Sequence, residues 1–230
     1  GCWRCCGCCG ANTALGATLA ENGCTLILDI TPSKDRVYQE YMPDAYPIVN
    51  TENRTDRFVA YLREHSSTPV SWQYDAIRAE ALADPDRLLY YRTDTHWNGM
   101  GAVLGLDGVL SAAGMDAVDF DAYEFTATGV TTGDLANVSA LYTLLPEENT
   151  WTASNYSELY SMDPRTVGVL GDSFSEYYMP YLQQRFDQCW RLTAETDLTP
   201  EKAADPGCDL MILEVTERNL DLLLELLAQF

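Results

Sequence analysis

Basic residues are scarce in this sequence. Its 230 residues include 14 lysines and arginines against 35 aspartates and glutamates, which gives a formal net charge of -21 at pH 7. A chain this acidic repels phosphate backbones and anionic membrane surfaces unless a local cluster of basic residues intervenes. The sequence contains no such cluster. We therefore exclude nucleic acid as a partner.

Long hydrophobic runs are also missing. The apolar stretches, such as residues 220–227, are short and interrupted by charge, whereas a membrane-spanning helix needs about 20 consecutive apolar residues. We therefore expect no direct membrane insertion by this chain. No positively charged segment leads into an apolar run after Gly1, so we expect a signal peptide or anchor to be absent or already removed.

Cysteines are unevenly distributed. Five of the eight lie at positions 2, 5, 6, 8 and 9, and the other three are Cys24, Cys189 and Cys208. A structural zinc site draws its ligands from two separated segments, and the N-terminal cluster has no second segment. We expect residues 1–11 to be a disordered leader or a fragment end, and residues 12–230 to form a single domain. A Cys189–Cys208 disulfide and buried free thiols are equally compatible with the sequence.

Strands and helices alternate along the body of the chain. Apolar runs typical of buried strands occupy residues 25–30, 70–72, 167–170, 189–192 and 210–215, and helical patterns occupy 12–22, 51–64, 75–83, 98–113, 175–186 and 220–227. Residues 88–91 are predicted to be extended, and 116–163 to be loops and short elements. Uniformly apolar strands indicate a parallel sheet with both faces covered. The predicted fold class is α/β, a three-layer domain with a mostly parallel central sheet.

The segment Gly171-Asp172-Ser173 places a serine after a predicted strand and directly before a predicted helix. Ser173 would thus lie at the carboxyl end of a strand, and open α/β sheets bind their ligands at the edge formed by the carboxyl ends of their strands. Glycine permits a tight turn, and N–H groups at the start of the helix can donate to an oxyanion. Ser173 is therefore a candidate nucleophile, with Gly171 and Asp172 as candidate oxyanion or substrate contacts. The alternative is that Asp172, Ser173 or Ser175 merely caps the helix.

Histidine is nearly absent, with His65 and His96 as the two examples. His65 ends a predicted helix, where a solvated side chain or a cation at the helix terminus is sufficient explanation. His96 follows an extended run, and residues two apart in such a run face the same way, so Asp94 and His96 can share a pocket. Asp94 would fix the tautomer of His96, whose Nε2 would accept the serine proton. One alternative is that Asp94 or Thr95 caps a helix and His96 is a packed histidine. The other is a zinc site, for which one histidine with scattered carboxylates is a poor ligand set.

These residues resemble the SGNH-like acetyltransferase proteins of the alginate O-acetylation family, also called DHHW proteins. Asp94-Thr95-His96-Trp97 matches that motif except at Thr95, and the Asp-x-His pair precedes the Gly-Asp-Ser block as it does in the family. The resemblance identifies Asp94 and His96 as acid and base and Ser173 as nucleophile. Further likeness lies in residues 31–38, 41–43 and 133–135. The departure at Thr95 should matter little, because in an extended segment its side chain points away from Asp94 and His96.

The resemblance implies an extracytoplasmic enzyme, an O-acetyltransferase or acetylesterase that modifies a polysaccharide through an acetyl-Ser173 intermediate. We expect neither a metal nor another cofactor. The implied partners are a polysaccharide acceptor and an acetyl donor, which a membrane-bound acyltransferase could deliver. Two alternatives stay open: a short-chain ester hydrolase, because the triad does not choose between water and a hydroxyl, and a non-catalytic carbohydrate-binding or assembly module of the same fold.

Four further residues are candidate substrate or oxyanion contacts. Arg218 and Asn219 follow the last predicted strand at the same sheet edge, although an exposed helix start also explains them. Trp97 and Tyr177 lie next to the motifs and could offer flat surfaces to sugar rings, although aromatic residues at helical spacing more often pack in a core. The net charge disfavours a highly anionic acceptor such as alginate, so we expect a neutral glycan.

Overall fold

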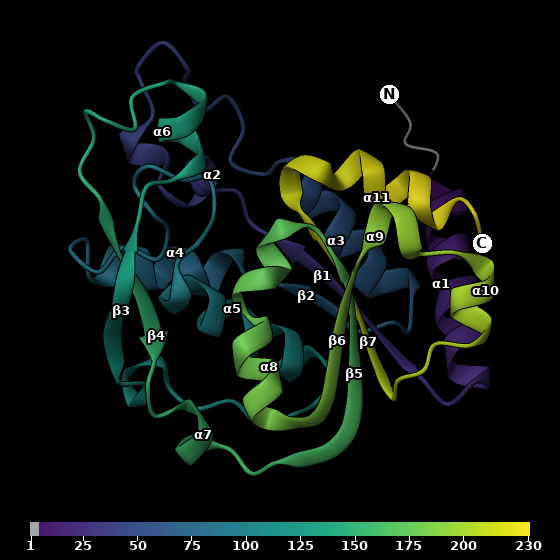
Figure 1. Cartoon of the computed structure of the whole chain (residues 1–230). Helices are drawn as coiled ribbons and strands as arrows, with labels where there is room; N and C mark the ends of the chain where they lie inside the picture. The colour runs from purple at the N-terminus through teal and green to yellow at the C-terminus, as the bar shows by residue number, and fades with distance from the viewer. Residues whose placement is uncertain (1–4) are drawn as a thin grey trace.

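The computed structural model describes residues 5–230. Its centre is a five-stranded sheet with the strand order β2-β1-β7-β5-β6 (Figure 1). The strands are β1 (Thr25–Thr31), β2 (Val70–Trp72), β5 (Asp163–Gly171), β6 (Phe186–Thr193) and β7 (Leu210–Thr216). All four strand pairs are parallel. The predicted α/β class with a parallel central sheet is therefore confirmed.

Helices cover both faces of this sheet. One face packs against α4 (Tyr74–Ala83), α5 (Gly99–Ala112) and α8 (Met179–Arg185), and the other against α1 (Cys5–Glu21), α3 (Arg54–His65) and α11 (Leu220–Leu227). Side chains of the strands alternate between these layers: Ile27 and Ile212 enter the first core, and Leu28 and Leu213 the second. Burial on both sides is why these strands are continuously apolar. Within residues 5–230, no helix combines the length and the apolar character that a membrane span requires.

A separate two-stranded antiparallel sheet lies apart from the central one (Figure 1). It pairs β3 (Phe125–Thr131) with β4 (Glu148–Ala153), and β4 packs against α5. We predicted loops and short elements here because most of β3 is exposed, so no apolar stripe marks it. The remaining elements are short: α2 (Lys34–Val37), η1 (Gln39–Tyr41), η2 (Phe120–Ala122), α6 (Asp134–Val138), α7 (Tyr156–Leu159), η3 (Ser173–Tyr177), α9 (Ala194–Asp197), α10 (Pro200–Ala204) and η4 (Glu217–Asn219).

Three other segments are predicted from the sequence as an extended run, a single helix and a leader. Residues 88–91 do not join the sheet, and Tyr90 instead forms one antiparallel bridge with Trp97. The helix predicted over 175–186 is divided into η3 and α8, and Pro180 lies in the first turn of α8, where its missing N–H leaves no bond unmade. Residues 5–11 of the predicted leader form the start of α1. The remainder of the predicted leader, residues 1–4, lies outside the described residues.

Candidate active site

Three side chains from separate parts of the chain meet at the carboxyl edge of the central sheet. His96 Nε2 lies 2.7 Å from Ser173 Oγ, and His96 Nδ1 lies 2.6 Å from Asp94 Oδ1. Ser173 is exposed, whereas the side chains of His96 and Asp94 are 13% and 11% exposed. The structure therefore brings the predicted nucleophile, base and acid into one hydrogen-bonded chain, with the nucleophile open to a substrate.

Ser173 stands on a turn that is tied to the end of the neighbouring strand β7. The Asp172 carboxylate caps η3 by accepting the N–H of Phe174 at 3.0 Å. It also accepts the N–H of Thr216 at 2.9 Å, the Thr216 hydroxyl, and the side-chain amide of Asn219 at 3.0 Å. Burial alone would raise the pKa of Asp172, but these hydrogen bonds hold it below its usual value. The capping role that we weighed as an alternative is real, and it positions Ser173.

A second carboxyl group, Glu214, lies fully buried beneath this turn. Its Oε2 accepts the N–H of Asp172 and its Oε1 accepts the hydroxyl of Thr31, both at 3.0 Å. Burial, followed by the charges of the neighbouring aspartates, raises the pKa of Glu214 well above its usual value. A Cβ at Gly171 would lie 2.6 Å from Ser175 Oγ and 2.9 Å from Glu214 Oε2. Gly171 and Asp172 thus shape the turn that carries Ser173.

Asp94 and His96 lie on a bent loop and not on an extended strand. The backbone N–H of His96 donates to Asp94 Oδ1 at 2.9 Å, the same oxygen that contacts the ring. A hydrogen bond from the backbone N–H two residues ahead to an aspartate side chain closes a common type of turn, the Asx-turn. Burial opposes ionisation of Asp94, but the hydrogen bonds from His96 and from the Asp134 N–H hold its pKa well below the usual value. The two side chains do meet, but a turn brings them together and not strand alternation.

Asp134, at the start of α6, is a member of the site that we missed. Its carboxylate accepts the N–H of Thr95 at 2.7 Å and the Thr95 hydroxyl at 2.6 Å, and its own N–H donates to Asp94 Oδ2 at 3.0 Å. Its Oδ2 also lies 3.8 Å from His96 Nδ1. Thr95 is therefore part of the network, contrary to our expectation. The sequence shows the likeness around Asp134, but no local pattern links it to His96.

Among the residues that the structure describes, Asp94, His96 and Asp134 form a group of side chains that could hold a metal ion, with ligand atoms within 4.8 Å of one another. The His96 ring, however, already bonds Asp94 through Nδ1 and faces Ser173 through Nε2. Both ring nitrogens of His96 therefore already have hydrogen-bond partners between which a proton can move. The arrangement suits acid–base chemistry better than metal binding.

Two further charged residues hold the backbone of this loop. Glu148, at the start of β4, accepts the N–H groups of Arg92 and Thr93, each at 2.6 Å. Lys34, at the start of α2, donates from Nζ to the carbonyl oxygens of Arg92 and Asp94, each at 2.9 Å. Burial lowers the pKa of Lys34 although carboxylates lie nearby. The loop is thus held from α2, α6 and β4, which gather at one end of the molecule (Figure 1).

The other residues predicted to contact the substrate differ in their exposure and in their neighbours. Trp97 is fully buried and donates from Nε1 to the Phe174 carbonyl at 3.1 Å. Trp97 therefore offers no exposed ring face in this structure. Tyr177 is half-buried and stacks on His96, with ring centres 5.3 Å apart. Arg218 is exposed, and its guanidinium lies 5.2 Å from the ring centre of Phe174, next to the nucleophile.

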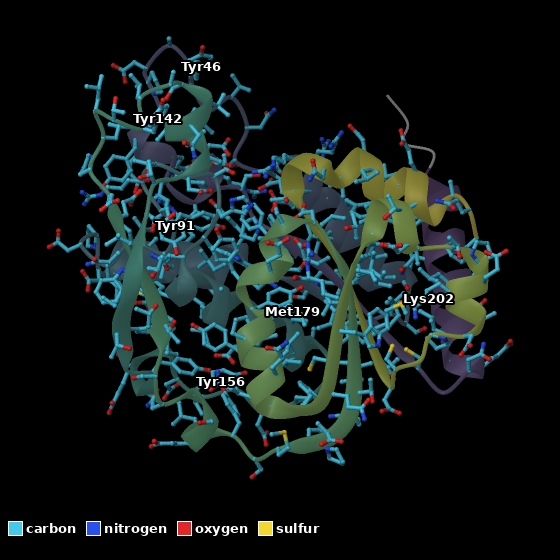
Figure 2. All side chains as sticks on the ribbon, in the orientation of Figure 1. Tyr46, Tyr91, Tyr142, Tyr156, Met179 and Lys202 are labelled. Atoms are coloured by element: carbon cyan, nitrogen blue, oxygen red, sulfur yellow. The ribbon has the colours of Figure 1, made fainter. Side chains whose placement is uncertain are left out.

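Two clefts are lined by sequence or ring neighbours of the triad, namely Tyr177 in one and Thr95 in the other, but by none of Ser173, His96 and Asp94 themselves. One has a volume of about 360 Å³ and is walled by the rings of Tyr91, Trp151, Tyr177 and Tyr181; Figure 2 marks Tyr91 near β3. The other has a volume of about 850 Å³ and contains Lys34, Thr95 and Arg218 together with Tyr46. Aromatic walls suit flat or ring-shaped ligands, and the second cleft adds charged groups.

The fold and the site together define a class of protein. A parallel sheet between helical layers carries a Gly-Asp-Ser turn after a central strand, and an Asp-x-His loop supplies the partners of that serine. This combination is that of an SGNH hydrolase-like domain. The family model described as "SGNH hydrolase-like domain, acetyltransferase AlgX" matches residues 11–205, and the chain belongs to this family.

Individual relatives agree with that assignment. The chain is 30% identical over 95 residues to the probable alginate O-acetylase AlgJ of Pseudomonas putida, a match that covers 41% of this chain and 24% of AlgJ. The matched region is thus about a quarter of that relative. The solved O-acetyltransferase domain of P. putida AlgJ has a TM-score of 0.61 at 18% identity, covering 95% of this chain and 88% of that one. A DHHW family protein from Eubacterium siraeum has a TM-score of 0.62 at 14% identity, with 91% and 84% covered. Both structures share the fold.

Proposed function

We propose that the chain is a serine-dependent O-acetyltransferase that acts on an extracellular polysaccharide through an acetyl-Ser173 intermediate. The hydrogen-bonded chain from exposed Ser173 through His96 to Asp94 carries this proposal. A non-catalytic binding module has no need for a serine paired to an ionised carboxylate through an imidazole. The acetyltransferase description of the family supports acetyl as the group, and the name of AlgJ supports a polysaccharide as the acceptor.

In the first half-reaction, Ser173 Oγ attacks the carbonyl carbon of the acetyl donor while His96 Nε2 accepts the hydroxyl proton. Asp94 stabilises the imidazolium through Nδ1. The tetrahedral intermediate then collapses, the bond to the donor oxygen breaks, and His96 returns its proton to that oxygen. Acetyl-Ser173 and the free hydroxyl of the donor are the products.

The negative oxygen of the intermediate needs hydrogen-bond donors. The backbone N–H of Ser173 opens η3, and the side-chain amide of Asn219 is held at the same edge by its bond to Asp172. We assign these two groups to the oxyanion. Arg218 adds a positive charge beside Phe174. Donors fixed before the reaction stabilise the developing charge without further reorganisation.

In the second half-reaction, an acceptor hydroxyl gives its proton to His96 and attacks the acetyl carbon. The bond between the acetyl carbon and Ser173 Oγ then breaks, and His96 returns the proton to Ser173 Oγ. Water in the same place yields acetate, so hydrolysis is the reaction expected when no acceptor is bound. The aromatic cleft beside Tyr177 would hold sugar rings during this step. We propose an extracytoplasmic location, because the acceptor is extracellular, and a membrane-bound acyltransferase as the source of the acetyl group.

The test measures turnover of an activated acetyl ester, with and without added polysaccharide. The wild-type protein should release acetate, and added polysaccharide should divert acetyl groups to its hydroxyls. Ser173→Ala should lose both reactions, whereas the matched control Ser157→Ala, at an exposed position away from the triad, should retain them. Turnover that survives Ser173→Ala would contradict the proposal. Ester hydrolysis with no transfer to any polysaccharide would reduce it to an acetylesterase.

A further inference from the structure

Two cysteines face each other at the amino edge of the central sheet, opposite to the edge that carries the triad. Cys24 Sγ lies 3.7 Å from Cys208 Sγ. Cys24 directly precedes β1, and Cys208 precedes β7 by two residues. Since β1 and β7 are neighbouring parallel strands, the sheet brings these thiols together from positions 184 residues apart.

The backbone around this pair has the spacing of a disulfide. Thr25 lies opposite Leu210, and its N–H donates to the Asp209 carbonyl at 2.8 Å. If the pairing of Thr25 with Leu210 is continued by one residue toward the amino ends, Cys24 lies opposite Asp209, the residue that follows Cys208. At ordinary strand spacings this offset corresponds to a Cα separation of about 6 Å. Disulfides bridge Cα separations of about 4.4–6.8 Å.

Cys189, the partner that we considered for Cys208 from the sequence, is on the wrong strand. Cys189 lies in β6 opposite Val167 of β5, and Val167 in turn lies opposite Leu210 of β7. The whole of β5 therefore separates β6 from β7, and two strand spacings amount to about 10 Å. That separation is too long for a disulfide. Burial also raises the pKa of Cys189 to about 11, which makes it a poor nucleophile.

The two thiols differ in accessibility. Cys24 is buried, whereas Cys208 is half-buried. The hydrogen bond from Cys24 lowers the pKa of Cys208, with smaller contributions from the Gly168 N–H and from the Lys202 ammonium. Lys202 lies on α10, which packs beside α1 (Figures 1 and 2). Cys208 is therefore the sulfur that an external reagent meets first, and Cys24 is the one that follows.

We propose that Cys24 and Cys208 form a modification site that closes to a disulfide by exchange with an external disulfide, either a small molecule or a protein. The Cys208 thiolate attacks one external sulfur, forms a mixed disulfide and releases one thiolate. Cys24 then loses its proton to solvent and attacks Cys208 Sγ, which breaks the mixed disulfide and releases the second thiolate. The cysteine pair is oxidised by two electrons, and the external disulfide is reduced to two thiols.

The bond would fasten the segment between α1 and β1 to the start of β7. A disulfide stabilises mainly by restricting the unfolded chain, and more so when it closes a long loop. Because the bond lies at the edge opposite to Ser173, the loops of the active site keep their positions. Oxidation should therefore raise thermal stability and leave ester turnover unchanged, which makes this inference independent of the proposed function.

The experiment treats the full chain with oxidised glutathione at pH 8, maps disulfide-linked peptides by mass spectrometry and measures Tm. The wild type and the matched control Cys189→Ser should both yield a peptide that joins Cys24 to Cys208. Their Tm should rise by roughly 5–15 °C and fall again with dithiothreitol. Cys208→Ser should show neither change. The N-terminal cysteines are common to all three proteins, so their reactions cancel in the comparison.

Several results would overturn the proposal. Two of them are a glutathione adduct that persists on Cys208 and a disulfide from Cys208 to a cysteine other than Cys24. The other two are Cys24 and Cys208 both remaining unmodified after treatment, and a Cys24–Cys208 disulfide that forms without a rise in Tm. Mapping the wild type keeps the proposal testable even if Cys208→Ser folds poorly.

Discussion

The two halves of the proposed active site are held in different ways. The turn under Ser173 is tied to Asp172 and Glu214, which lie in or directly against the buried central sheet. The loop that carries His96 is tied to Asp134 and Glu148, which belong to α6 and β4, outside that sheet. We infer that folding of the core positions Ser173, whereas contacts from a peripheral layer position His96. Changes on the first side should therefore affect stability, and changes on the second mainly activity.

The largest effect is expected where the two halves join. Ser173→Ala and His96→Ala should each lower ester turnover by about 10³-fold to 10⁶-fold, and the double variant should lose little more, because the residues act as one unit. Turnover of an activated acetyl ester measures all three variants. If the losses multiplied in the double variant, the serine and the histidine would be acting independently.

On the base side, Asp94→Asn should lower turnover by about 10³-fold to 10⁴-fold, because an amide cannot hold the imidazole in the required tautomer. Asp134→Asn and Glu148→Gln act one step further from the reaction, and we expect losses of about 10-fold to 100-fold, as for other groups that orient a reacting side chain. Urea titration should show unfolding free energies within about 1 kcal/mol of wild type for these two variants.

The control for Asp134→Asn and Glu148→Gln is Glu158→Gln, at an exposed position. This variant should change neither ester turnover nor the free energy of unfolding. A large loss of stability in Asp134→Asn or Glu148→Gln would remove the distinction between the two halves.

On the nucleophile side, Asp172→Ala should lower the free energy of unfolding by about 3–5 kcal/mol, because several buried donors lose their acceptor. The folded-state pKa of Asp172 is lowered, so its stabilisation is present above the unfolded-state pKa of about 3.9 and is lost as pH falls through the lower folded-state value. The difference from wild type in urea titrations should therefore be full at pH 7 and shrink below about pH 4.

The matched control for Asp172→Ala is Asp121→Ala, whose side chain is 87% exposed and whose removal should cost less than about 0.5 kcal/mol. Equal stabilities for Asp172→Ala and wild type at pH 7 would mean that the sheet does not hold the turn through this carboxylate.

The smallest effect concerns the acceptor. The net charge of -21 should slow encounter with anionic alginate and not with a neutral glycan, and salt screens this repulsion. Raising the ionic strength from about 0.01 M to about 0.15 M should increase acetylation of alginate a few-fold relative to a neutral glucan. Arg218→Ala, which removes an exposed positive charge on the nucleophile side, should enlarge the salt effect. Alginate acetylation that falls with salt would instead indicate local attraction of the polyanion.

The same division explains what the sequence could predict. Ser173 could be found because the strand, the glycine and the following helix are adjacent along the chain. Asp94 and His96 could be found because they are two residues apart and histidine is rare. The contacts of Asp134 and Glu148 with this loop could not be found, because the two residues lie 39 and 55 positions away from it in the sequence, in a region where the strand β3 is mostly exposed and carries no apolar pattern. The folded structure is therefore needed to show that Asp134 and Glu148 lie beside the loop that carries His96.

The most direct test of the central claim is to find the acetyl group on the enzyme. The protein is mixed with an activated acetyl ester, quenched in acid within the first turnover, digested, and mapped by mass spectrometry. An acetyl-Ser173 intermediate predicts one acetyl group on the peptide that contains Ser173, much slower accumulation of this group in His96→Ala, and no acetyl group on this peptide in Ser173→Ala. Turnover by the wild type with no acetyl group on Ser173 at any time, or with the group on another residue, would contradict it.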